Sequence, residues 1–134
     1  MTTENGAREL IYARFVTLWA ATSAYTFDNE KFEPTLGAAW VRLAVRHGVA
    51  GQETLGPKPH RRYTRRGRIF LQIFIPRNQG IKEQDTIVRK FRELFEGESF
   101  SEVDCTNVIH REIGPDGVWW QSQAEAAFSY YETK

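Results

Sequence analysis

The residues of this sequence that could support catalysis or metal binding are few and far apart. The three histidines, His47, His60 and His110, belong to no HxH or HExxH pattern, and a metal site needs several nitrogen, oxygen or sulfur ligands that converge. The single cysteine, Cys105, has no cysteine-enzyme motif around it and is typical of a small core residue. Phosphate-binding glycine loops and the GxSxG pattern are also missing from the sequence. The sequence therefore predicts no catalytic residues, no cofactor and no metal; the alternative is an enzyme whose site has no recognisable motif.

Positive charge is concentrated in one short segment, residues 58–68. Six of the 18 Lys and Arg residues fall there, and they are Lys58, Arg61, Arg62, Arg65, Arg66 and Arg68. Because prolines precede this run and Gly67 interrupts it, we expect a loop over residues 57–67 between two strands. Such a loop can neutralise nucleic-acid phosphates, protect an edge strand from aggregation or contact an acidic neighbouring subunit. The residues alone leave these three interpretations open.

Length and composition predict one soluble globular domain over residues 1–134. The chain has 134 residues, of which 41% are hydrophobic and 26% charged, and these values are ordinary for a single folded domain. No apolar run approaches the roughly 18 residues that a membrane span requires. The polar N-terminus does not resemble a signal peptide. We therefore expect no membrane partner, and a protein that stays in the cytoplasm where it is made.

The first half of the chain predicts one helix and one half-buried strand. Apolar residues recur at helical spacing over residues 4–21, and residues 39–47 alternate between apolar and polar. Between them, residues 22–37 have no period and predict an irregular connection with one short extended piece. Residues 51–56 are a candidate second strand before the basic loop.

The second half predicts a central strand, a helix and a hairpin. Residues 68–75 are almost wholly apolar, as in a strand covered on both faces, and residues 81–96 carry one apolar stripe at helical spacing. A short strand is expected over 100–104. Residues 106–113 and 118–131 then predict a hairpin around Gly-Pro-Asp-Gly. The expected fold class is α+β, with a mixed or antiparallel sheet of four to five strands and two helices packed on it.

Several segments, in this order, resemble the family of small siphophage tail terminator-like proteins, also described as minor tail or head–tail joining proteins. The segments are Phe15 to Trp19, Tyr25 to Asn29, Phe32 to Pro34, Ala39 to Leu43, Gln52 to Gly56, Arg66 to Pro76, Gly80, the helix with Phe91, Leu94, Phe95 and Gly97, and finally Trp120, Gln121 and Phe128. The polar stretch after Pro76 departs from the small-residue loop often seen in the family. The resemblance covers nearly the whole chain.

The resemblance implies a structural role in a bacteriophage or prophage, without catalysis. It implies a hexameric ring that caps the tail tube, ends tail polymerisation and provides the surface for head–tail joining. The implied partners are further copies of the chain, the tail tube protein and a head-completion or connector protein, while DNA passes through the lumen without sequence-specific binding. The implied location is the virion tail, with the host cytoplasm as the place of assembly.

Under this resemblance the basic loop becomes a candidate subunit interface. The residues in that hypothesis are Arg61, Arg62, Arg65, Arg66 and Arg68. The alternative function is a small nucleic-acid-binding module that uses the basic loop 58–68. Two observations disfavour this alternative: the net charge is only +1, and the sequence contains no RRM, KH or helix-turn-helix signature.

Overall fold

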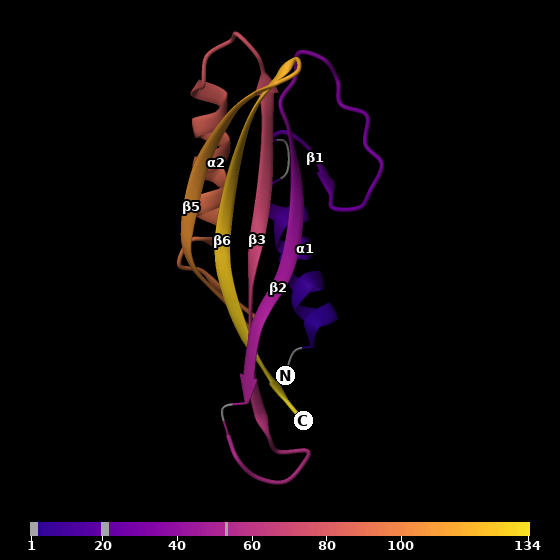
Figure 1. Ribbon diagram of the computed structural model, residues 1–134, viewed down its shortest axis with the longest axis vertical. Coiled ribbons are helices and arrows are strands. Elements are labelled where there is room, and N and C mark those ends of the chain that lie inside the picture. The colour runs from indigo at the N-terminus through magenta and orange to yellow at the C-terminus, as the bar shows by residue number, and fades with distance from the viewer. Residues whose placement is uncertain (1–2, 20–21, 53) are drawn as a thin grey trace.

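A six-stranded sheet with two helices packed on one of its faces makes up the fold (Figure 1). The computed structural model describes residues 3–19, 22–52 and 54–134. The elements are α1 (Glu4–Trp19), β1 (Ala24–Phe27), β2 (Trp40–Gln52), β3 (Arg62–Pro76), α2 (Lys82–Phe95), β4 (Ser99–Phe100), β5 (Val103–Asp116) and β6 (Trp119–Thr133). The strand order is β1-β2-β3-β6-β5-β4. Strand β1 runs parallel to β2, and the other pairs are antiparallel.

The core lies between the helices and one face of the sheet, which we call the helical face. The alternation in β3 sends Ile69, Leu71 and Ile73 to this face, where they are fully buried. Helix α2 covers them with the apolar stripe that contains Phe91 and Leu94. Helix α1 adds its own buried row, Ala7, Ile11, Phe15 and Trp19. The alternating apolar residues of the strands and the apolar stripes of the helices therefore form one continuous core.

The predicted α+β class is confirmed, but the sheet has more strands than the four to five expected. Strands β1 and β4 have four and two residues, too few for a period to be recognised in sequence. The expected strand over 51–56 is wrong as a separate element, because β2 continues to Gln52. The expected strand over 100–104 is divided between the ends of β4 and β5. Residues 20 and 21 of the expected N-terminal helix lie outside the described residues.

The largest difference concerns the basic segment, which is mostly strand and not the loop predicted over 57–67. Strand β3 begins at Arg62 and pairs with both β2 and β6. Gly67 does not mark a turn: a Cβ placed there would lie 2.6 Å from Cζ of Phe128. The glycine is needed because an aromatic ring and the β2 backbone approach the strand closely.

Candidate interaction surfaces

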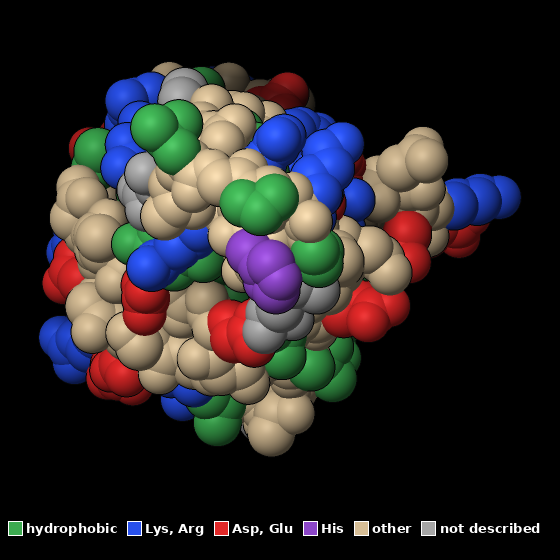
Figure 2. Space-filling model, turned by 90° about the horizontal axis from the view of Figure 1, so that it is seen from below, with side chains coloured by type: hydrophobic (Ala, Val, Ile, Leu, Met, Phe, Trp, Pro, Cys, Tyr) green, Lys and Arg blue, Asp and Glu red, His purple; other side chains and the backbone are tan. Residues whose placement is uncertain are grey.

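The arginines predicted as one interface are distributed over three places in the fold. Seen from the end that carries the β2–β3 loop, Lys and Arg side chains gather in clusters in the upper half of the view (Figure 2). Residues 54–61 form the loop itself and carry Lys58 and Arg61. Nε of Arg61 donates a hydrogen bond to the carbonyl oxygen of Gly56 at 2.7 Å. Its main chain exchanges two hydrogen bonds with Lys134, so Arg61 ties the base of the loop to the C-terminal residue.

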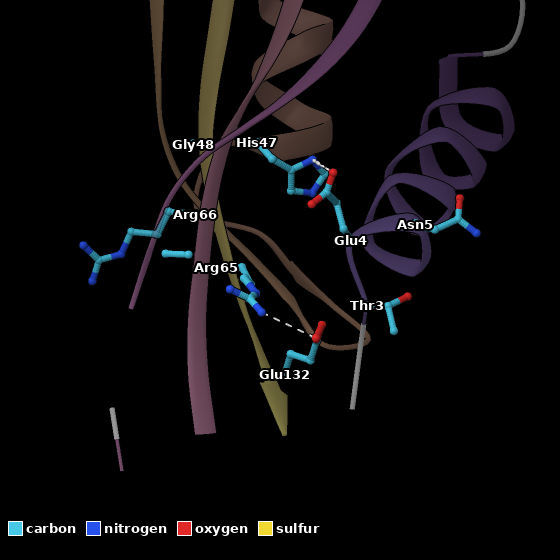
Figure 3. Close-up of a pocket in the computed structure, with 9 residues that line it drawn as sticks. Thr3, Glu4, Asn5, His47, Gly48, Arg65, Arg66 and Glu132 are labelled. Atoms are coloured by element: carbon cyan, nitrogen blue, oxygen red, sulfur yellow. Dashed lines mark ion pairs between the residues drawn. The ribbon is translucent and has the colours of Figure 1, made fainter. Parts of the chain in front are cut away.

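Arg65 lies on the helical face, beside the N-terminus of α1. Its Nη2 is 3.6 Å from Oε1 of Glu132. Figure 3 shows Arg65 directed toward Glu132, whereas Arg66 points away on the far side of the strands. A cavity of about 460 Å³ opens here between β2, β3 and the first turn of α1. Arg65 is therefore occupied by an intramolecular ion pair.

His47 lines the same cavity, with Nδ1 3.7 Å from Oε1 of Glu4 (Figure 3). Its ring packs edge-on against the rings of Phe128 and Tyr130. Burial lowers the pKa of the imidazole, the nearby Glu4 carboxylate opposes that shift, and Arg8 adds to it. The histidine is thus held mainly in its neutral form at neutral pH and acts as part of the packing.

The remaining arginines of the basic segment point to the other side of the sheet, which we call the open face because no helix formed by the described residues covers it. The guanidinium carbon of Arg62 lies 3.5 Å above the centre of the Tyr131 ring. Arg66 and Arg68 border a second cavity, of about 380 Å³, together with Arg46, Phe70 and other residues. The structure therefore separates Arg61 and Arg65 from the other three predicted residues.

Three further arginines from other strands join the open face. Strand register places Arg46 directly opposite Arg68, and Arg42 opposite Gln72. Arg111 reaches the same face from β5, where its Nη2 is 3.0 Å from Oε1 of Glu125. These residues could not be recognised from the sequence because each is isolated in it; strand pairing alone brings them together.

Net charge differs between the two faces. Along the long strands, the open face carries six arginines and three carboxylates. They are Arg42, Arg46, Arg62, Arg66, Arg68 and Arg111, with Asp104, Asp116 and Glu125. The helical side, counted over both helices and the strand residues beneath them, carries as many Lys and Arg residues as carboxylates, seven of each. Its members are Arg8, Arg14, Arg65, Lys82, Arg89, Lys90 and Arg92, with Glu4, Glu9, Glu83, Asp85, Glu93, Glu112 and Glu132.

Exposed apolar side chains mark the two ends of the long axis. Leu55, in the loop at one end, is 94% exposed. Val118 and Ile113, at the β5–β6 hairpin end, are also exposed, and the hairpin and the loop lie at opposite ends of the molecule (Figure 1). Isolated exposed apolar residues are common, but their position at both tips makes the tips suitable for protein contacts.

The residues considered for chemistry lie apart from one another. Cys105 is buried, and burial raises the pKa of its thiol to about 12, so the sulfur stays protonated near neutral pH. Among the described residues, no group of three His, Cys, Asp or Glu side chains could hold a metal ion. Within the same residues, no helix is long and apolar enough to cross a membrane.

A known protein family and a solved structure are similar to this chain. The family model described as "Phage tail terminator protein" matches residues 8–121. The search of curated proteins found no match. One solved structure is 16% identical in sequence, with a TM-score of 0.66, over 92% of this chain and 94% of the other. That similarity shows a shared fold, and the family match covers most of the chain.

Proposed function

This chain belongs to the phage tail terminator protein family, and from that premise we propose that it caps the tail tube, ends tail polymerisation and provides the surface for head–tail joining. The family match over residues 8–121 carries this proposal. Membership in a structural family also assigns the chain a structural role in the phage tail. The resemblance to the tail terminator family, first seen in the sequence, is confirmed by this family match.

The assembled form that we propose is a closed ring, a hexamer by resemblance to the family. A head-to-tail contact between identical copies generates a ring when the rotation between neighbours closes. The exposed apolar side chains at the two tips support two different docking ends on such a ring. One end would meet the tail tube protein and the other a head-completion or connector protein. DNA would pass through the central hole without sequence-specific binding.

The subunit contact that we propose uses the end that carries the loop 54–61. Of the five arginines first assigned to it, Arg61 and Arg62 lie at this end, at the base of the loop and the start of β3. Arg65 is paired with Glu132, and Arg66 and Arg68 face the open side of the sheet. Charge pairs across an interface set the register and orientation of partners more than their affinity. The revised interface therefore consists of the loop, Arg61 and Arg62.

The experiment that tests the function is deletion of the gene from its phage, followed by electron microscopy of the lysate. We expect complete heads and separate tails that are overlong or irregular, with normal particles restored when the protein is supplied from a plasmid. Joined, infectious particles with tails of normal length in the deletion lysate would remove the proposal.

The interface is tested in the same complementation assay with Arg61→Ser/Arg62→Ser. A matched control is Arg89→Ser/Arg92→Ser, which removes two charges from the exposed face of α2. We expect the first variant to fold but to give few joined particles, and the control to restore joining. Equal restoration by both variants would contradict the assignment of the contact.

A further inference from the structure

Two features of the open face favour an anionic partner. Arg46 and Arg68 are directly opposite each other on neighbouring strands, an arrangement that is destabilising for like charges. Arg66 lies two residues before Arg68 on the same face, and no ion pair to it is found within the described residues. A bound anion would relieve the repulsion among these three guanidinium groups.

Intramolecular carboxylates neutralise this charge only in part. Asp28 pairs with Arg46 at 2.6 Å, and Glu125 lies 3.8 Å from Arg68 and 3.0 Å from Arg111. The Glu125 side chain is only 5% exposed, whereas those of Arg68 and Arg111 are more than half exposed. The carboxylate is therefore buried beneath the two guanidinium groups and holds them toward solvent.

The length of the arginine array matches an extended partner better than a small ion. Arg42 lies opposite Gln72, which is six residues from Arg66 along β3. At a rise of ~3.3 Å per residue in a strand, the array from Arg66 to Arg42 extends over about 20 Å. Duplex DNA carries one phosphate charge per ~1.7 Å of its helix axis. An array of this length can therefore meet several phosphates of one duplex.

We propose that the open face of the sheet is a DNA-contacting surface that binds the phosphate backbone of a duplex without reading its sequence. The guanidinium fork suits phosphate oxygens, because it donates parallel hydrogen bonds in one plane. The rest of this face includes Gln72, Gln123 and Ser129, which can also donate hydrogen bonds to phosphates. Within the described residues, no helix lies on this face to enter a groove, so base edges stay out of reach.

This inference deepens the proposed function, because it assigns the side of the chain that faces the DNA inside the assembled tail. It also assigns a nucleic acid, and not an acidic protein, as the partner of this face. A protein partner would require matching carboxylates at fixed positions, whereas a duplex offers a regular row of phosphates along its whole length.

The test uses the full chain and a labelled DNA duplex of about 20 base pairs, with binding followed by fluorescence anisotropy at ~50 and ~200 mM NaCl. The variant is Arg42→Gln/Arg46→Gln/Arg66→Gln, which leaves Arg68 and Arg111 in place over the buried Glu125. The matched control, Arg89→Gln/Lys90→Gln/Arg92→Gln, removes the same charge from the exposed face of α2. Melting curves of all three proteins verify that each is folded.

We expect wild-type binding that weakens steeply with salt and is equal for two duplexes of unrelated sequence. The open-face variant should bind at least ~10-fold more weakly at low salt, with a salt slope lower by about 0.9 for each phosphate that the protein no longer neutralises. The control should bind like the wild type. If the triple variant is poorly folded, Arg66→Gln alone gives the same test with a slope lower by about 0.9.

Three outcomes would overturn the inference: no DNA binding by the wild type at low salt, equal losses in the variant and the control, or strong dependence on sequence. The first would direct attention to an acidic protein as the partner. None of these outcomes affects the proposed function, which fails only if phage without the protein still assemble normal, joined particles.

Discussion

The two faces of the sheet differ in what determines their residues. On the helical face, alternate residues of β3 are fully buried and apolar, and two helices cover them. On the open face the same strand presents Arg66, Arg68, Phe70 and Gln72, which are exposed or half-buried. The first face is constrained by packing and the second by charge. Substitutions on the two faces should therefore affect different measurements.

The largest expected effect on stability is on the helical face. Phe91→Ala removes a fully buried ring of α2 and should lower the free energy of unfolding by about 3–5 kcal/mol. Urea denaturation followed by circular dichroism measures it. The control Arg89→Ala, on the exposed side of the same helix, should change it by less than ~0.5 kcal/mol. A decrease below about 1 kcal/mol in Phe91→Ala would mean that α2 packs elsewhere.

An intermediate effect is expected where the two faces meet in the backbone of β3. Gly67→Ala would bring its new methyl group against the ring of Phe128 and should cost about 1–3 kcal/mol. In contrast, a Cβ at Gly51 meets no atom within 4 Å, so Gly51→Ala provides the comparison. Thermal denaturation of the two variants should separate them clearly. Equal melting temperatures would show that the Phe128 ring lies farther from Gly67 than the 2.6 Å between its Cζ and a Cβ at that position.

A small effect on stability is expected on the open face. Arg66→Gln should change the free energy of unfolding by less than ~0.5 kcal/mol, as for a surface substitution away from buried contacts. The substitution should nevertheless reduce DNA affinity, because the Arg66 side chain belongs to the proposed phosphate-binding surface. A decrease in stability as large as that of Gly67→Ala would mean that Arg66 supports the fold, and the distinction between the faces would not hold.

The smallest effect concerns the ion pair at the edge of the open face. A hydrogen bond from Arg46 holds the pKa of Asp28 below its ordinary value. Because the folded-state pKa is lowered, the pair stabilises the fold above the unfolded-state pKa of Asp28 and loses this contribution as pH falls through the folded-state value. NMR titration should show the pKa of Asp28 returning toward its ordinary value in Arg46→Gln. An unchanged pKa would contradict the contact.

Long periodic segments could be predicted from the sequence, whereas contacts between distant segments could not. Helix α2 was expected over 81–96 and occupies Lys82–Phe95, because its apolar stripe is local information. The second arm of the hairpin was likewise expected over 118–131 and occupies Trp119–Thr133. Short strands such as β4 form only because a neighbouring strand offers hydrogen-bonding groups, and a pair of residues carries no period.

The candidate surface shows the same limit. Arg66 and Arg68 stand out in sequence because they belong to a dense run, but Gly67 led to the interpretation of that run as a loop. Proline and glycine in sequence do not distinguish a turn from a close approach between strands. Arg42, Arg46 and Arg111 are single charges in their own strands, and the register of β2 and β5 had to be known before they could be placed beside the others.

Because Cys105 is buried, its chemical modification can be used to follow transient local unfolding around β4 and β5. It is the sole sulfhydryl of the chain, it lies on the strand next to the short β4, and only 5% of its surface is accessible. An alkylating reagent can therefore modify it only when this region transiently separates, and the modification rate then reports the frequency of that separation. Mass spectrometry of the intact chain would measure the fraction of modified protein over time without any engineered label. The measurement can be made on free protein and on protein incorporated into tails.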